Sequence, residues 1–140
     1  MHREEPRYME FPRVPDKRGH LIFIEGENTI PFPIKRVYYI CNIPDKSIKR
    51  GGHAHKGVKE VVVALAGSFT AICDNGSTKS IFPMSQFDIG LYVPEMVWLE
   101  LSDFSSGAIC LVLSSEYYNE KNYVRKYADF LKHISKGESK

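Results

Sequence analysis

The sequence predicts an all-β fold, a jelly-roll sandwich or barrel that carries one C-terminal helix. From about residue 20 to residue 115, short runs of β-branched and aromatic residues alternate with turn residues. There are eight such runs, as many as the strands of a jelly roll. At 140 residues with 43% hydrophobic composition, the chain is long enough to bury a core, and we expect a single domain over residues 1–140.

Glycine and other turn-forming residues separate the expected strands. Asp74-Asn75-Gly76 supplies the positive-φ residues that a hairpin needs. Gly67 interrupts a long apolar run, where we expect a bulge or a corner. The strands predicted in this way cover residues 21–24, 34–40, 58–66, 68–73, 77–81, 89–93, 97–101 and 108–114.

A C-terminal helix is predicted by a change in the spacing of apolar residues after residue 115. Tyr123, Tyr127, Phe130, Leu131 and Ile134 recur at helical spacing, so we expect an amphipathic helix whose apolar stripe packs on the sheet. The polar ends, residues 1–15 and 136–140, are expected to be loose or to contact a partner subunit.

Charge and cysteine content exclude several classes of partner. Nineteen Lys and Arg against 17 Asp and Glu give a net charge of +2, so neither nucleic acid nor an anionic membrane is indicated. No apolar run approaches the ~20 residues of a membrane span. The three cysteines, Cys41, Cys73 and Cys110, are odd in number and lie in apolar runs, which indicates small core residues in a reducing compartment. We expect a cytoplasmic protein.

The most informative segment contains two histidines between basic residues. On a strand, His53 and His55 lie on one face with their Cα atoms about 7 Å apart, and Ala54 faces away. Arg50 and Lys56 flank the pair with fixed positive charge. That charge suits an anionic group such as a diphosphate or a developing enolate.

The spacing of His53, His55, Glu60 and Gly67 resembles the first motif of the cupin superfamily, a jelly-roll class. In metal-binding cupins the equivalents of the two histidines and Glu60 are ligands, together with a further histidine from a second motif. Two histidines and a carboxylate suit Fe(II) or Mn(II). Leu99 stands where the second motif needs its histidine, so a metal site ranks below a metal-free one.

A closer resemblance covers nearly the whole chain. Blocks at residues 33–40, 50–56, 91–94, 98, 103–106, 111–118 and 123–127 follow in the same order as in the nucleotide-sugar 3,4-ketoisomerases of the WxcM-like type. The resemblance implies a cupin without metal or other cofactor that moves a carbonyl from C4 to C3 of a dTDP-linked 6-deoxyhexose. The product would feed 3-acetamido-3,6-dideoxy sugars for cell-surface glycans. The resemblance also implies a homodimer whose N-terminal strands can be exchanged between subunits.

Three residues are catalytic candidates by this resemblance. The reaction removes the C3 proton, holds an enediolate and returns a proton at C4, and a neutral imidazole is a suitable base. By position His53 is the base, and His55 stabilises the enediolate or relays protons. Tyr39 matches a family tyrosine at the sugar. The alternative interpretation of Tyr39 is that it is an aromatic residue of the core. Tyr38, of opposite parity, is the control for that assignment.

Five further residues are candidates for substrate binding. Arg50 is expected at the diphosphate or the enediolate, while Arg36 and Lys56 are either substrate contacts or solvated charge. Arg18 matches an N-terminal arginine of the branch that yields the galacto-configured product. Leu99 replaces a polar residue that in relatives reaches the sugar and is tied to the reprotonation of C4, so it bears on product stereochemistry.

Other functions remain open on the sequence alone. The dTDP-sugar 3,5-epimerases share the jelly roll and an Arg-Gly-x-His segment, but His55 and the tyrosine-rich C-terminal block favour the ketoisomerase. A non-catalytic or altered-specificity nucleotide-sugar-binding cupin is suggested by Leu99. A metal cupin on His53, His55 and Glu60 is the third alternative. Glu60 stands where the ketoisomerases commonly carry Gln, and a carboxylate there can raise the pKa of a nearby imidazole.

Overall fold

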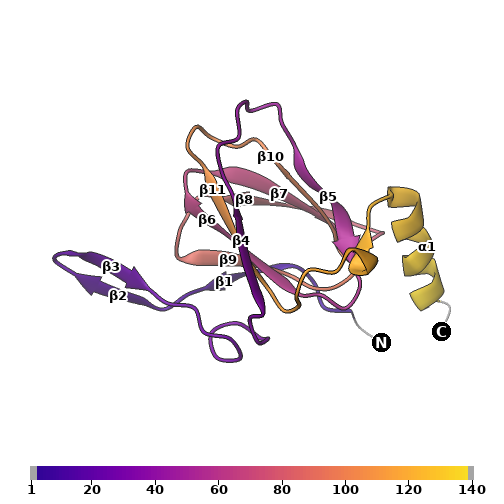
Figure 1. Ribbon diagram of the computed structural model, residues 1–140, viewed down its shortest axis with the longest axis horizontal. Coiled ribbons are helices and arrows are strands. Elements are labelled where there is room, and N and C mark those ends of the chain that lie inside the picture. The colour runs from indigo at the N-terminus through magenta and orange to yellow at the C-terminus, as the bar shows by residue number, and fades with distance from the viewer. Residues whose placement is uncertain (1–2, 139–140) are drawn as a thin grey trace.

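The computed structural model describes residues 3–138, and in it two five-stranded sheets face each other (Figure 1). Every pairing between named strands is antiparallel. One sheet has the order β1 (Arg7–Glu10), β9 (Ile89–Val93), β6 (Glu60–Ala66), β11 (Ile109–Ser114) and β4 (Arg36–Ile40). The other has the order β12 (Tyr123–Val124), β5 (Arg50–His55), β10 (Trp98–Ser102), β7 (Phe69–Asp74) and β8 (Lys79–Met84).

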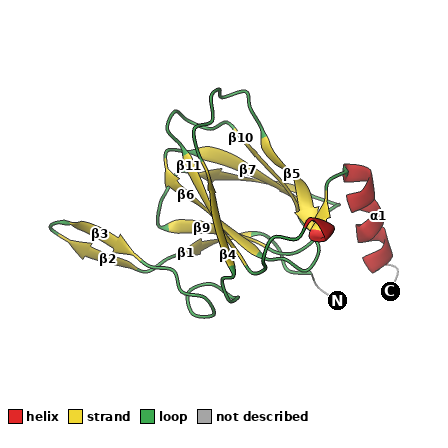
Figure 2. Cartoon of the chain, viewed as in Figure 1, coloured by secondary structure: helices red, strands yellow, loops and turns green. Residues whose placement is uncertain are grey.

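Four further elements lie outside the two sheets. Strands β2 (Arg13–Asp16) and β3 (Gly19–Ile22) form a two-stranded arm that projects from the sandwich (Figure 1). A short 3-10 helix, η1 (Glu120–Asn122), precedes β12, and the helix α1 (Tyr127–Glu138) follows it beside β5 (Figure 2). None of the helices within residues 3–138 is long and apolar enough to cross a membrane.

The main core lies between the two sheets because each strand alternates apolar residues toward that space. It is formed by buried side chains from both sheets, including Val62, Ala71, Leu91, Leu99, Leu101, Cys110 and Val112. Burying one such aliphatic side chain contributes about 1.5–3 kcal/mol, and this packing also fixes which face of every strand points inward.

Two smaller clusters cover the outer faces of the sheets. Phe11, Ile30 and Phe32 of the N-terminal segment pack on the outer face of the sheet that contains β6 and β9. On the other sheet, Phe130 and Ile134 of α1 pack against Ala54, Trp98 and Val124. The helix therefore supports β5 from outside and leaves its inner face free.

The predicted all-β class with a C-terminal helix is confirmed, and the expected strands between residues 34 and 114 all form. Some boundaries of the prediction are wrong; the strand expected at residues 21–24 is displaced to Gly19–Ile22. Tyr123 is not helical, because it pairs with His55 in β12, and α1 begins only at Tyr127. Residues 7–10 are not loose, because they pair with β9; residues 1–2 and 139–140 lie outside the described chain.

Candidate active site

His53 and His55 lie together on the inner face of β5. Ala54 between them faces outward into the cluster under α1, as the period-two spacing predicts. The two imidazole rings stand edge to face with their centroids 4.7 Å apart. The residue His55 is only 8% exposed, so this pair lies at the edge of the interior between the two sheets.

A bulge in β5 brings Arg50 to the same face as the histidines. Leu99 of β10 pairs with His53 and Leu101 pairs with Arg50, although the intervals along the two strands differ by one residue. Gly51 and Gly52 absorb the extra residue with φ values of +79° and +76°. Since Leu99 and Leu101 both face the core, Arg50 shares the face of His53 despite its odd spacing.

The tyrosine of β4 that faces the histidines is Tyr38, and the expectation for Tyr39 is wrong. Tyr38 pairs with Val112, which points into the core, and its hydroxyl donates to Glu60 Oε2 at 2.8 Å. Tyr39 pairs with Leu111 on the outer face and is 67% exposed. Adjacent residues of a strand point to opposite faces, so only one tyrosine of the pair can reach the site.

Glu60 is a buried carboxyl group between Tyr38 and His55. It opens β6 and faces inward, with only 2% of the residue exposed. Its Oε1 lies 3.6 Å from Nδ1 of His55, while Oε2 accepts the Tyr38 hydroxyl. Burial raises the pKa of Glu60 to about 7, against the opposing effects of the Tyr38 hydrogen bond and the positive charge of Arg36.

Both histidines are neutral at physiological pH. Burial lowers the pKa of His53, and the positive charge of Arg125 lowers it further. Burial also lowers the pKa of His55 to about 3, with added repulsion from His53, Arg36 and Arg125. In the described chain, Nδ1 of His53 is buried without a hydrogen-bond partner. The site therefore offers neutral imidazoles that can accept protons.

Tyr123, from the C-terminal segment, packs its ring against both histidines on one side. The Tyr123 ring lies 5.0 Å from the His53 ring and 4.4 Å from the His55 ring, centroid to centroid. Arg36 Nη1 donates to the Tyr123 hydroxyl at 3.3 Å, which joins β4 to β12. Sequence reasoning missed Tyr123 because its apolar spacing matches the helix that follows.

An ion pair between Arg125 and Glu120 packs against the Tyr123 ring. Arg125 donates to both carboxylate oxygens of Glu120, at 2.6 and 2.9 Å, and its guanidinium lies 4.3 Å from the Tyr123 ring centroid. Tyr118 also donates to Glu120, at 2.5 Å. The signal that could have found these residues is the density of tyrosines and charges between residues 117 and 125.

Residues 4–135 match the family model described as FdtA: WxcM-like, C-terminal. The chain belongs to this FdtA family, as its sequence resemblance predicted. A curated relative, TDP-4-oxo-6-deoxy-alpha-D-glucose-3,4-oxoisomerase of Aneurinibacillus thermoaerophilus, is 42% identical over 132 residues, which cover 94% of both chains.

Solved structures of ketoisomerases share this fold closely. One is a histidine-to-asparagine variant of the 3,4-ketoisomerase QdtA from Thermoanaerobacterium thermosaccharolyticum in complex with TDP-4-keto-6-deoxyglucose, at 40% identity. Its TM-score is 0.90, and the alignment covers 94% of each chain. A 3,4-ketoisomerase from Helicobacter canadensis has a TM-score of 0.91 at 35% identity, covering 95% of this chain and 99% of that one. The FdtA family match favours the ketoisomerase over the 3,5-epimerase.

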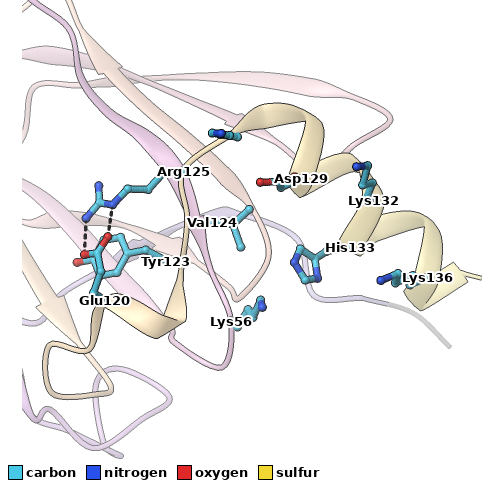
Figure 3. Close-up of a pocket in the computed structure, with 10 residues that line it drawn as sticks. Lys56, Glu120, Tyr123, Val124, Arg125, Asp129, Lys132, His133 and Lys136 are labelled. Carbon is cyan, nitrogen blue, oxygen red and sulfur yellow. Dashed lines mark hydrogen bonds and ion pairs between the residues drawn. The ribbon is translucent and has the colours of Figure 1, made fainter.

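Three of the expected substrate-binding residues of this FdtA member lie in different parts of the structure. Leu99 is buried and directly opposite His53 on β10. Lys56 follows β5 and lines a cavity of about 530 Å³ beside α1, which also borders Tyr123 (Figure 3). Arg18 lies on the projecting arm, where its guanidinium donates to Asp16 at 3.0 and 2.7 Å. A single chain therefore does not bring Arg18 to the site.

The metal-cupin set of His53, His55 and Glu60 does not fit the geometry of this FdtA member. Within residues 3–138, no three His, Cys, Asp or Glu side chains converge as metal ligands. One Glu60 oxygen already accepts the Tyr38 hydroxyl, and the other lies 3.6 Å from Nδ1 of His55. The carboxyl is thus arranged to interact with an imidazole.

Proposed function

We propose that this protein converts TDP-4-keto-6-deoxyglucose into a TDP-linked 3-keto-6-deoxyhexose. The observation that carries the proposal is the pair of neutral imidazoles on the inner face of β5, His53 and His55, beside the buried Tyr38 and Glu60. The 42% identity to a curated TDP-sugar 3,4-oxoisomerase supports the same substrate and the same reaction.

The reaction needs no oxidant, because its net change is the transfer of one proton from C3 to C4 and of another from the C3 oxygen to the C4 oxygen. A neutral imidazole takes the C3 proton, and the electron pair of that bond moves toward the C4 carbonyl, so that an enediolate forms with negative charge on the C4 oxygen. A proton is then added to C4. The C3 hydroxyl loses its proton and becomes the new carbonyl, while the C4 oxygen gains one.

We assign the first step to His53. Its Nδ1 is buried, so Nε2 is the ring nitrogen left to meet the substrate and to take the C3 proton. The lowered pKa keeps the ring neutral, as a base must be before it acts. His55 receives the second role, because its Nδ1 side is turned to Glu60 and its opposite side is left for the sugar.

Positive side chains around the histidines suit the two anionic parts of the substrate. Arg50 shares the inner face with His53 and is assigned to the enediolate or the diphosphate. Arg36 lies 4.4 Å over the Tyr38 ring and donates to Tyr123, so its charge is held near the reacting sugar. Lys56 lies beside a cationic cavity that fits phosphate groups.

A homodimer would give Arg18 its place in the site. The arm exposes Val14 and Leu21, and a two-stranded ribbon is marginally stable by itself. Strand β4 is also an edge strand, with Val37 and Tyr39 exposed on its outer face. Exchange of the arm with a second copy would cover these surfaces and carry Arg18 toward the partner's site.

The three free cysteines support the expected cytoplasmic location.

Incubation with TDP-4-keto-6-deoxyglucose in D2O, followed by proton NMR, tests the function. A 3-keto sugar with deuterium at C4 is the expected product, and the His53→Asn variant is the inactive control. Exchange at C3 and C5 without movement of the carbonyl would identify an epimerase instead. Binding without exchange would identify a nucleotide-sugar-binding module.

A further inference from the structure

Glu60 is a buried carboxyl group that the ketoisomerase reaction does not directly require. It faces Tyr38 and Arg36 from β4, His55 from β5 and Cys110 from β11. A carboxyl so deeply buried is costly unless its oxygens are used. Tyr38 uses one oxygen at 2.8 Å, which leaves the other for His55.

The contact with His55 involves one defined nitrogen. Glu60 Oε1 lies 3.6 Å from Nδ1, slightly beyond hydrogen-bond length, so a small rotation of either side chain closes the bond. In an imidazole the two nitrogens point to opposite sides of the ring. Nε2 therefore points away from Glu60, and a neutral ring carries its single proton on only one nitrogen.

Above its raised pKa of about 7, Glu60 is ionised and can accept a hydrogen bond from His55. Burial raises this pKa, whereas the Tyr38 hydroxyl, which donates to the carboxylate, and the positive charge of Arg36 oppose that rise. An ionised carboxylate only accepts hydrogen bonds. The nitrogen that faces it must therefore carry the proton of His55.

We propose that Glu60 is a positioning residue that fixes His55 as the Nδ1–H tautomer and so presents the Nε2 lone pair to the sugar. The proposal rests on the proposed ketoisomerase function. In that reaction, Nε2 of His55 takes the proton that leaves the C3 hydroxyl when the new carbonyl forms and delivers it to the C4 oxygen. The carboxylate of Glu60 then faces the positive imidazolium and stabilises it.

The tautomer of His55 can be measured directly in the unaltered protein. Histidine labelled with 15N distinguishes a protonated from an unprotonated ring nitrogen, and His55→Asn identifies the signals of His55. At pH 8, above the pKa of about 7 of Glu60, we expect Nδ1 protonated and Nε2 unprotonated. Finding the proton on Nε2 would overturn the proposal, whether or not the enzyme turns over this sugar.

Variants of the pair test the consequence for catalysis. Glu60→Met alone leaves the Tyr38 hydroxyl buried without a partner, so the double variant Tyr38→Phe with Glu60→Met protects the fold. We expect it to lose the Nδ1–H tautomer and at least about 100-fold in kcat, with KM changed less than about threefold. Glu60→Gln keeps an acceptor oxygen and is expected to restore both the tautomer and most of kcat.

Two controls separate positioning from a general effect of buried carboxyl groups. Tyr38→Phe alone keeps Glu60 beside His55 and is expected to keep the tautomer. Asp74→Asn alters another buried carboxyl with a tyrosine partner, outside the site, and is expected to leave kcat and the His55 signals unchanged. An unchanged tautomer or an unchanged kcat in the double variant would contradict the proposal. An unaltered enzyme that fails to isomerise the sugar would contradict only the proposed function.

Discussion

Two buried carboxyl groups in this protein each accept a tyrosine hydroxyl, yet their surroundings differ. Glu60 accepts from Tyr38 at 2.8 Å inside the sandwich, and Asp74 accepts from Tyr127 at 2.6 Å under the C-terminal helix. The second oxygen of Asp74 accepts the backbone N–H of Gly76 at 2.8 Å, whereas that of Glu60 faces His55.

This difference separates a structural pair from a chemical one. A carboxyl that is satisfied by a hydroxyl and a backbone N–H closes a turn and ties α1 to the β7–β8 hairpin. A carboxyl with one oxygen turned to a titratable ring can influence the protons of that ring. The partner of the second oxygen therefore distinguishes the two roles better than burial, since both residues are nearly inaccessible.

The largest effect on the site around Glu60 and the histidines is expected from His53→Asn. Because this change removes the proposed base, we expect kcat for carbonyl migration to fall by more than about 1000-fold. The thermal unfolding temperature should stay within a few degrees, since Asn is polar and smaller than the half-buried imidazole. Turnover by proton NMR near the unaltered rate would remove His53 from the mechanism.

The pH dependence of stability distinguishes Glu60 from a carboxyl group whose pKa is the same in the folded and unfolded chain. Burial raises its pKa to about 7, so the folded chain keeps a proton that the unfolded chain releases, and stability falls as pH rises from 4.5 to 7. For His55 the pKa is lowered to about 3, so stability falls as pH drops from 6.5 to 3. Between pH 4.5 and 6.5 the two effects oppose each other.

The Glu60→Gln variant removes the contribution of Glu60 to the pH dependence of stability and leaves that of His55. The variant's stability should then rise with pH between 4.5 and 6.5, more steeply than that of the unaltered protein by about 1.4 kcal/mol per pH unit. Urea unfolding at three pH values measures the slope. Parallel slopes for the two proteins would contradict the shifted pKa of Glu60.

Changes to the pair of Asp74 and Tyr127 should alter the stability of the protein but not its kcat. Tyr127→Phe leaves Asp74 without its hydroxyl partner, and we expect a loss of about 1–2 kcal/mol in the free energy of unfolding. Its kcat should match that of the unaltered enzyme. A drop in kcat without a drop in stability would show that the helix side of the sandwich takes part in the reaction.

The smallest expected effect belongs to Leu99→His. Leu99 lies opposite His53, so an imidazole there adds a polar group beside the sugar. We expect a change of a few fold in rate or a measurable change in product configuration at C4, read from the NMR coupling constants. An identical rate and product would exclude this position from control of reprotonation.

The sandwich and the histidine pair could be predicted from sequence because both depend on local spacing. Alternation on β5 places His53 and His55 together whatever surrounds them. The choice between Tyr38 and Tyr39 could not be predicted, since it depends on which face of β4 meets the core, and this is set by pairing with β11. Tyr123 was missed because its strand pairing with β5 overrides a helical pattern.

The bulge in β5 means that two residues without side chains decide where a charge lies. A Cβ on Gly51 would stand 2.7 Å from the carbonyl oxygen of Leu99, whereas one on Gly52 would meet no atom within 4 Å. Gly52 is required only by its positive φ, and Gly51 by both φ and space. Deleting either glycine would remove the bulge and leave Arg50 two residues before His53, still on the inner face. With both glycines in a regular, unbulged strand, the three-residue spacing would instead turn the Arg50 guanidinium to the outer face. The spacing of this segment is therefore as much a part of the catalytic design as its basic residues.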